Sequence, residues 1–330
     1  MITIRNESKN PYFNLALEEY MLKYFDCNQN IAFLWQDEPT VVVGRNQNTV
    51  EEVNGQYIKD HHIHVVRRLS GGGAVYHDHG NLNFTFIMKN QRHHETDFKM
   101  FTEPVIKTLA KLGIHAEFSG RNDITIEGKK FSGNAQYYYQ NHLLHHGTIL
   151  FHSDLSVVQE ALNVKQDKIE SKGIKSVRSR VTNIFPYLKK PISIEAFKKI
   201  LLDTMLETGN LEPQEYLLTN KDVEKIEALM KERYMTWEWN YGESPNFNIQ
   251  KSRRFSGGNI DIRLNIHKGW IKNCKIYGDF FGHSEIVTLE TMLKDVKYEE
   301  ETIRSTLRSI DLNHYFLGIT LDDFINCLFY

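Results

Sequence analysis

The apolar and polar positions of the N-terminal part predict one helix followed by short strands. Asn10-Pro11 precedes an amphipathic pattern over 12–22, which indicates an N-cap, a proline at the first helical position and a helix. Apolar runs at 31–35 and 40–44 predict two strands, because each run is short and Asp37-Glu38-Pro39 between them favours a turn.

The pattern continues with strands on both sides of a glycine-rich segment and with three more helices. The first of these helices ends at Gly113, a residue type that commonly follows a helix C-terminus. The predicted helices cover 97–112, 194–207 and 222–234, and the predicted strands cover 65–66, 83–87, 124–126 and 146–151.

The last part of the chain predicts a small separate α+β unit. Gly242, Pro245 and several asparagines make 237–248 a candidate linker. We therefore expect two domains, residues 1–246 and residues 247–330. Within the second, apolar runs at 259–265 and 270–277 predict a hairpin turning at His267-Lys268-Gly269, followed by helices at 288–294, 300–309 and 321–328.

Composition narrows the class of protein. The 330 residues are 41% hydrophobic and 25% charged, as in an ordinary globular protein, and the net charge of −2 excludes a general nucleic-acid-binding surface. The N-terminus has no signal-peptide pattern, and no apolar run approaches the roughly 18–20 residues of a membrane span, so we expect a cytoplasmic protein. Cys27, Cys274 and Cys327 are odd in number and far apart, which favours reduced thiols.

The segment Arg67–Asp78 holds three consecutive glycines after two arginines. Glycines let backbone N–H groups approach a ligand, and arginine guanidinium groups suit phosphate or carboxylate. The segment lacks the Lys-Ser/Thr of a P-loop, and the strand that follows it excludes a dinucleotide fingerprint. Two interpretations remain: a phosphate-binding loop, or a glycine hairpin with solvated arginines. Arg253–Gly258 repeats the beginning of this motif, which we interpret as chance.

A second candidate segment runs from Gly120 to Ala135. Lys130 lies at a predicted strand start among small residues, where its cation would offset charge on a carboxylate and an α-phosphate as they combine. Asn122 and Asp123 suit ribose hydroxyls, and Asp123 suits Mg²⁺. The competing interpretation is a turn at Asn122-Asp123 and a hairpin tip at Gly128-Lys129.

Adjacent histidines do not predict a metal site. Neighbouring strand residues point to opposite faces, so His145-His146 cannot act as joint ligands, and His61-His62 and His93-His94 fail for the same reason. We interpret His146 as a hydrogen-bond donor in a pocket, with a structural histidine as the alternative.

The segment Lys165–Lys190 carries eight Lys or Arg and two acidic residues. A solvated loop and a functional loop are both open interpretations. As a functional loop it would close over a bound intermediate or meet an acidic partner surface.

Together these motifs resemble one family. Arg67–Asn81 (Arg-Arg-x-Ser-Gly-Gly-Gly-Ala-Val-Tyr-His-Asp-x-Gly-Asn) is similar to the signature of single-chain bacterial lipoate–protein ligases. The segments that resemble its other motifs follow in the same order, at 120–124, 130–135, 146–150 and 175–183.

The resemblance implies a large α+β catalytic domain with mixed and antiparallel sheets, related to biotin protein ligases and class II aminoacyl-tRNA synthetases, plus a small C-terminal domain. It implies ATP, Mg²⁺, a lipoyl-adenylate and transfer to a lysine of lipoyl carrier domains, such as 2-oxoacid dehydrogenase E2 subunits and the glycine cleavage H protein, by a monomer. By motif position, the resemblance implies that Lys130 is the catalytic residue and contacts both substrates. The residues implied for ATP are Arg68, Gly73, Ala74, Val75 and Tyr76, beside Asn122 and Asp123. The residues implied for lipoate are Ser70, Gly71, Gly133, Ala135 and His146.

Two rival functions remain. A cysteine-dependent octanoyl or lipoyl acyltransferase of the same superfamily needs an activated thiol. No motif contains a cysteine, and Cys27 is expected at a helix end far from every motif. A nonenzymatic lipoate-binding protein would bind the ligand without releasing pyrophosphate. A biotin ligase would carry a Gly-Arg-Gly-Arg loop, which is absent from this sequence.

Overall fold

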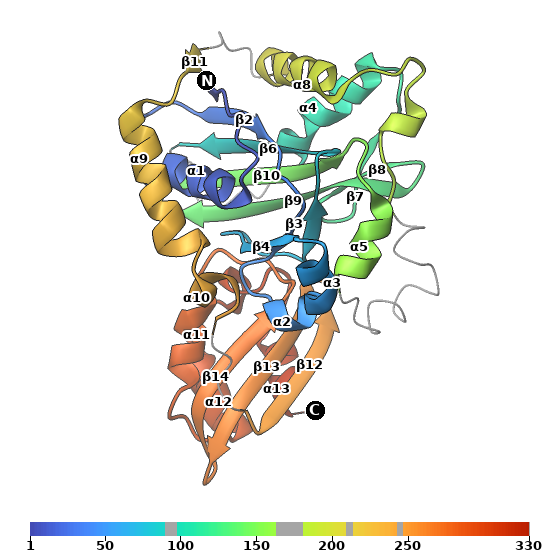
Figure 1. Cartoon of the computed structure of the whole chain (residues 1–330). Helices are drawn as coiled ribbons and strands as arrows, with labels where there is room; N and C mark the ends of the chain where they lie inside the picture. Colours follow the sequence, from blue (N-terminus) through green and yellow to red (C-terminus); the bar gives the residue numbers. More distant parts are fainter. Residues whose placement is uncertain (90–97, 163–180, 209–213, 243–246, 330) are drawn as a thin grey trace. The chain divides into compact units, whose positions relative to one another are not determined.

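The computed structural model describes residues 1–89, 98–162, 181–208, 214–242 and 247–329 (Figure 1). Contacts divide the chain into two compact units. Unit 1 comprises Met1–Val42, Val50–Arg67 and Val75–Asn240, and unit 2 comprises Val43–Thr49, Arg68–Ala74 and Tyr241–Tyr330. Two short N-terminal segments, one of them the glycine-rich loop, thus cluster with the C-terminal residues. The domain boundary at residue 246 stays a prediction.

Unit 1 is built on a mixed sheet that pairs antiparallel along most of its width (Figure 1). Its parallel pairs join β11 to β1 and β1 to β2, and the strands from β2 onward pair antiparallel. In spatial order the strands are β11 (Gln214–Tyr216), β1 (Ile2–Ile4), β2 (Ile31–Trp35), β6 (Asn81–Met88), β10 (His142–Leu150), β9 (Lys129–Tyr139), β8 (Asp123–Ile126) and β7 (Glu117–Ser119).

Helices cover both faces of this sheet. On one face, α4 (Phe98–Lys111) and α8 (Ile194–Thr208) bury an apolar core that includes Phe84, Phe131 and Ile149. The other face, toward α1 (Pro11–Lys23), combines buried apolar residues such as Phe33 and Ile87 with polar contacts, for example the hydrogen bond from Thr85 to Glu18. Strand alternation separates the two environments, because neighbouring residues point to opposite faces.

The predicted N-terminus of α1 is confirmed, but its amphipathic pattern is wrong. Asn10 accepts hydrogen bonds from Tyr12 N and Phe13 N, and Pro11 is the first helical residue. However, every residue from Asn14 to Leu22 is buried. Two of these are carboxylates: Glu18 bonds within the sheet, and Glu19 bonds Lys23, Tyr234 and Arg233. Buried charges are stable only when they are paired in this way.

The helices and strands predicted in unit 1 are present, but the short helices at 49–52, 55–60 and 155–161 were not predicted. Residues 237–240, predicted as linker, form helix α10, and the helix predicted over 222–234 begins at Asn220 and ends in a π-helical turn at Met230–Tyr234. Unit 1 also contains a second sheet, with strands in the order β4 (His64–Arg67), β3 (Thr40–Val43) and β5 (Val75–His77). Its remaining helices are α2 (Thr49–Glu52), α3 (Gly55–Asp60), α5 (Leu155–Ala161), α9 (Asn220–Leu229) and α10 (Trp237–Asn240), with a 3₁₀ turn at Phe185–Tyr187.

Unit 2 packs one antiparallel sheet against helices. Strands β12 (Ile249–Phe255), β13 (Gly258–His267) and β14 (Trp270–Gly278) form the sheet, and α11 (Ile286–Leu293), α12 (Glu300–Leu307) and α13 (Leu321–Phe329) cover it, with a 3₁₀ turn at Leu312–His314. The predicted hairpin and its turn are confirmed, with Lys268 and Gly269 at positive φ. Strand β12 was missed because its sequence, Ile-Gln-Lys-Ser-Arg-Arg-Phe, carries polar residues on an edge strand.

The α+β class and the mixed and antiparallel sheets are confirmed. Within the described ranges, no helix is both long and apolar enough to cross a membrane. Three predictions lie wholly or mostly outside those ranges: the His93-His94 pair, Pro245 in the candidate linker, and residues 165–180 of the basic segment.

We predict that Asp222→Asn destabilises unit 1 in a pH-dependent way. Burial alone would raise the pKa of Asp222, but hydrogen bonds from Thr219, Tyr20 and Tyr216 lower it from 3.8 to about 2. A depressed carboxylate pKa stabilises the fold by about 2 kcal/mol above the ordinary pKa, and this stabilisation is lost as pH falls through the folded-state pKa. Urea unfolding should therefore show a difference between the proteins near neutral pH that shrinks below about pH 4. A difference that is constant with pH would contradict this.

Candidate functional site

Lys130 owes its position to an irregularity in the β8–β9 pairing. Ile124 pairs with Ser132 and Thr125 pairs with Lys130, so Phe131 is an extra residue in β9. Such a bulge changes the direction in which neighbouring side chains point. Lys130 Nζ lies 2.7 Å from Asp123 Oδ1, and the two side chains are 38% and 36% exposed. The pair is therefore formed and also reachable from solvent.

Gly133 provides the space that Lys130 occupies. A Cβ atom at position 133 would lie 2.8 Å from Lys130 Nζ and 3.0 Å from Lys130 Cε, closer than real contacts allow. Gly133 is also the register partner of Asp123. The ammonium group thus lies over Gly133, which leaves room for it, and beside the carboxylate of Asp123, which binds it.

The backbone of Lys130 is held by the described end of the basic segment. Thr182 N donates to Lys130 O at 2.8 Å, and Val181 forms a parallel bridge with Lys130. The Asn183 side chain in turn bonds Ser153 N and Ser153 O, both at 2.9 Å. The Val-Thr-Asn portion of that motif is therefore part of the support of Lys130.

Asn122 and Gly128 adopt the local structures that the alternative interpretation predicted. Asn122 lies in a turn, donates to Asn134 O at 2.5 Å and accepts from Asn134 N at 2.9 Å. Glu127 and Gly128 have φ of 50° and 73°, so they form the tip of the β8–β9 hairpin. The turn and the hairpin tip do not compete with a site, because together they position Asp123 and Lys130.

His146 lies further along the face that carries Gly133. It is the register partner of Ala135, and its Nδ1 lies 3.0 Å from both carboxylate oxygens of Glu18. Thr85 donates to Glu18 at 2.5 Å and accepts from Trp35 Nε1 at 2.8 Å. His146 is therefore both a donor and a structurally bonded histidine. Sequence reasoning missed Glu18 because a glutamate on a helix is usually solvated.

His145 points to the opposite face, as predicted. Its ring stacks on Phe84 and Phe101, and burial with His146 nearby lowers its pKa well below the ordinary value. The two adjacent histidines therefore cannot share a metal, and His145 is a neutral core residue.

The two arginines before the glycines are buried, so their interpretation as solvated side chains is wrong. Arg67 is 8% exposed and Arg68 is 7% exposed. Arg67 donates to Trp239 O at 2.8 Å and to Asn240 O at 3.1 Å. Arg67 thus has a structural role in unit 1, while Arg68 begins the loop assigned to unit 2.

Arg68 holds the glycine-rich loop by donating to three of its acceptors. These are Ser70 Oγ at 3.1 Å, Gly71 O at 2.7 Å and Gly73 O at 2.9 Å. The planar fork of a guanidinium group suits several fixed acceptors better than an ammonium group does.

The three glycines of this loop differ in their surroundings. A Cβ at Gly71 would lie 2.5 Å from Phe280 O, and Gly72 has a φ of 93°, so both positions require glycine within unit 2. A Cβ at Gly73 would meet no atom within 4 Å among the described residues. Gly73 is thus the member of the three whose backbone a ligand can approach.

The structure brings the predicted site residues together in two groups. Asp123, Lys130, Gly133, Ala135 and His146 share one face of the unit 1 sheet. Arg68, Ser70, Gly71, Gly73 and Ala74 form the loop in unit 2, which leads into Val75 and Tyr76 on β5.

Sequence comparison decides the family. The family model described as "Lipoyl protein ligase A/B catalytic domain" matches residues 10–206, and the "Bacterial lipoate protein ligase C-terminus" matches residues 244–328. The chain is 47% identical to "Lipoate-protein ligase LplJ" of Bacillus subtilis over 331 aligned positions, covering 100% of both chains. The chain belongs to the lipoate–protein ligase family.

Solved structures of this lipoate–protein ligase family agree with the fold. The P. falciparum protein LipL1 in complex with lipoate has a TM-score of 0.79 at 26% identity, covering 99% of this chain and 97% of that chain. A lipoate–protein ligase A bound with ATP has a TM-score of 0.65 at 28% identity, covering 73% of this chain and 98% of that chain.

We predict that Arg68→Ala loosens the glycine-rich loop. The change leaves three buried or half-buried acceptors without their donor, which costs about 1–3 kcal/mol each if none is recovered. Hydrogen exchange at the amides of Gly71–Ala74 should speed up, and Arg68→Lys should restore it only in part, because an ammonium group lacks the fork. Arg253→Ala, which removes an exposed arginine of the same unit, is the control. Unchanged exchange in Arg68→Ala would contradict the role of Arg68 as the residue that holds the loop.

Proposed function

We propose that this chain activates lipoate with ATP to lipoyl-AMP and transfers the lipoyl group to a lysine of a carrier protein. The observation that carries the proposal is the Lys130–Asp123 pair over Gly133, a preformed cation on a solvent-reachable sheet face. The similarity to lipoate–protein ligases along the whole chain supports it.

The reaction joins two anions, so it needs positive charge where they meet. The lipoate carboxylate attacks the α-phosphate of ATP, and pyrophosphate leaves. Lys130 offsets the negative charge that accumulates on the transferring group, and a fixed cation does so without reorganising as the reaction proceeds. The acceptor lysine, as the free amine, then attacks the mixed anhydride and releases AMP.

The sheet face of unit 1 suits one of the two substrates, lipoate, in this proposal. Gly133, Ala135 and His146 extend along one sheet face from Lys130, which suits a lipoate chain that ends with its carboxylate at the ammonium group. The residues proposed for lipoate are Lys130, Ser70, Gly71, Gly133, Ala135 and His146, and those proposed for ATP are Lys130, Arg68, Gly73, Ala74, Val75, Tyr76, Asn122 and Asp123.

Asp123 suits two tasks. Its carboxylate holds Lys130, and at 36% exposure its oxygens can also be reached by a hydrated divalent cation. Mg²⁺, as a proposed cofactor, would neutralise charge on the ATP phosphates. Residues 1–246 are proposed to carry adenylation and transfer, with residues 247–330 as an accessory domain.

The proposed partners are lipoyl carrier domains, namely E2 subunits of 2-oxoacid dehydrogenases and the glycine cleavage H protein. The proposal is for a cytoplasmic monomer.

Two of the three cysteines are unsuited to the cysteine-dependent alternative. Cys274 and Cys327 are buried, and burial raises the pKa of Cys327 to about 11 and that of Cys274 still further. Cys27 does not end a helix, because α1 stops at Lys23, and its sulfur accepts a hydrogen bond from Gln29 N. A nucleophilic thiol needs a lowered pKa, so the raised pKa values of Cys274 and Cys327 argue against both as nucleophiles.

The test of the function is the mass of a carrier domain incubated with the protein, lipoate and ATP. We expect a gain of one lipoyl group on a carrier lysine, with no gain when ATP is omitted. Lys130→Ala should lower the rate by about 10²–10³-fold, as for the loss of one preorganised electrostatic group. Lys129→Ala, an exposed neighbour at the hairpin tip, and Cys27→Ser are the controls and should retain activity. An inactive Cys27→Ser would favour the acyltransferase instead.

Gly133→Ala should inactivate the protein without unfolding it. The new methyl group meets only the flexible end of Lys130, so the thermal midpoint should stay near that of the wild type. The displaced ammonium group should lower adenylation by up to about 10²-fold, as misplacement by about 1 Å can do. Gly55→Ala, where a Cβ meets no described atom within 4 Å, is the matched control. Full activity in Gly133→Ala would show that the position of Lys130 over Gly133 is not needed.

A further inference from the structure

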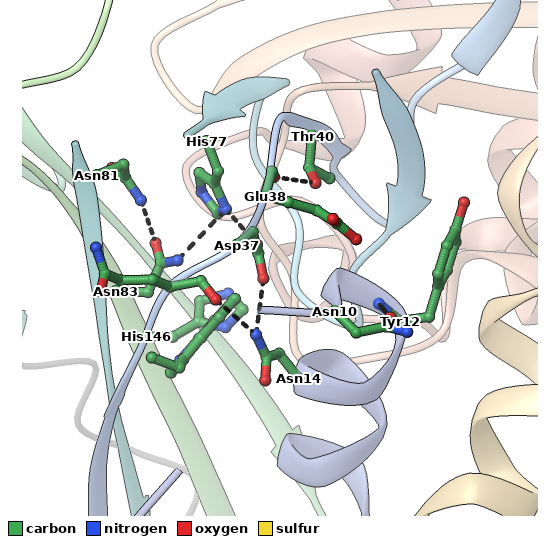
Figure 2. Close-up of polar contacts among 12 residues, drawn as sticks. Asn10, Tyr12, Asn14, Asp37, Glu38, Thr40, His77, Asn81, Asn83 and His146 are labelled. Carbon is green, nitrogen blue, oxygen red and sulfur yellow. Dashed lines mark hydrogen bonds and ion pairs between the residues drawn. The ribbon is translucent and has the colours of Figure 1, made fainter. Parts of the chain in front are cut away.

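We propose that Asp37 and His77 form a positioning pair that fixes the nucleotide-binding strand β5. The inference rests on the proposed function, in which Val75 and Tyr76 of β5 bind ATP. Figure 2 shows the His77 side chain directed at Asp37.

The pair is buried and closely bonded. His77 is 2% exposed, Asp37 is 0% exposed, and His77 Nδ1 lies 2.8 Å from Asp37 Oδ2. A carboxylate can only accept, so Nδ1 carries the proton and donates it. The other oxygen of Asp37 accepts from Asn14 Nδ2 at 2.8 Å, which connects the pair to α1 (Figure 2).

Strand β5 needs such an attachment because its backbone pairing is short. It has three residues and lies at the edge of its sheet, where it pairs with β3 through Thr40, Val41 and Val42. One end of β5 continues into the glycine-rich loop, and His77 is the last residue of the other end. The His77 side chain therefore joins this edge strand to the turn between β2 and β3.

A second observation distinguishes this pair from an ordinary structural contact. His77 Nε2 and Asn81 Oδ1 are buried, and neither has a hydrogen-bond partner among the described residues. Asn81 Nδ2 donates to Asn83 Oδ1 at 2.9 Å, so both of these atoms belong to the polar cluster drawn in Figure 2. Buried polar atoms without partners are rare in native proteins and often mark functional positions.

The pair acts through β5. Its hydrogen bond sets the orientation of His77, and His77 sets the backbone that presents Val75 and Tyr76. An error in that backbone weakens every contact that these residues make with the nucleotide, while contacts with lipoate on β9 and β10 remain. The pair therefore governs ATP affinity more than lipoate affinity, because only Ser70 and Gly71 of the proposed lipoate residues lie in the loop that leads into β5.

The test measures ATP binding by calorimetry without lipoate, and KM for ATP and for lipoate in adenylation. His77→Ala and Asp37→Ala should weaken ATP binding by about tenfold or more, as expected for a lost bond to a charged group, with KM for lipoate changed less than about twofold. His77→Asn and Asp37→Asn keep a donor or an acceptor near the original atoms and should bind ATP close to the wild-type affinity. Asp222→Asn, a buried carboxylate elsewhere in unit 1, controls for lost stability and should leave both constants unchanged.

Each outcome decides one claim. Equal ATP affinity in the wild type, His77→Ala and Asp37→Ala would overturn the inference and leave the proposed function intact. Loss of ATP binding in His77→Asn as severe as in His77→Ala would also overturn it, because a direct role of Nε2 would then replace positioning. A wild-type protein that binds no ATP would instead contradict the proposed function.

Discussion

The ion pair between Lys130 and Asp123 over Gly133 is the constraint on which the account of this site depends. A lysine side chain has many rotamers, and its ammonium group stabilises a developing charge only where it is already in place. Three features of the chain confine it: a bulge at Phe131, a glycine under the ammonium group and a carboxylate beside it. A fourth feature acts on the backbone of Lys130, whose carbonyl oxygen accepts a hydrogen bond from Thr182 N.

The second face of the sheet explains why this arrangement is stable in unit 1. The α4 and α8 side holds one apolar core, and the α1 side combines buried apolar residues, such as Phe33 and Leu144, with hydrogen-bonded polar groups. There, buried acids are bonded by neighbours: Glu18 by Thr85 and His146, and Asp37 by Asn14 and His77. A sheet face on which buried polar groups are hydrogen-bonded among apolar neighbours holds side chains for chemistry on a rigid support.

The sequence predicts those parts of the fold that local physics determines. The cap at Asn10, the stop at Gly113 and the turn at Lys268-Gly269 each follow from one residue type in one backbone conformation. Lys130 was predicted from its small neighbours, yet the bulge that directs it depends on pairing with β8 and leaves no local signal. Arg68 was predicted as a ligand-binding residue, and its bonds to Ser70, Gly71 and Gly73 are local contacts that the residue types of the loop do not reveal. Strand β12 and the burial of Glu18 were missed because both depend on what covers them.

The central claim is that this face activates a carboxylate, and the most direct test omits the carrier altogether. Protein, lipoate and ATP are mixed in a single turnover, and pyrophosphate is measured together with any acyl-adenylate that remains bound. The account predicts a burst of pyrophosphate stoichiometric with the protein, dependent on lipoate, with lipoyl-AMP recovered from the complex. Tight lipoate binding without pyrophosphate release would contradict it and would identify a binding protein instead.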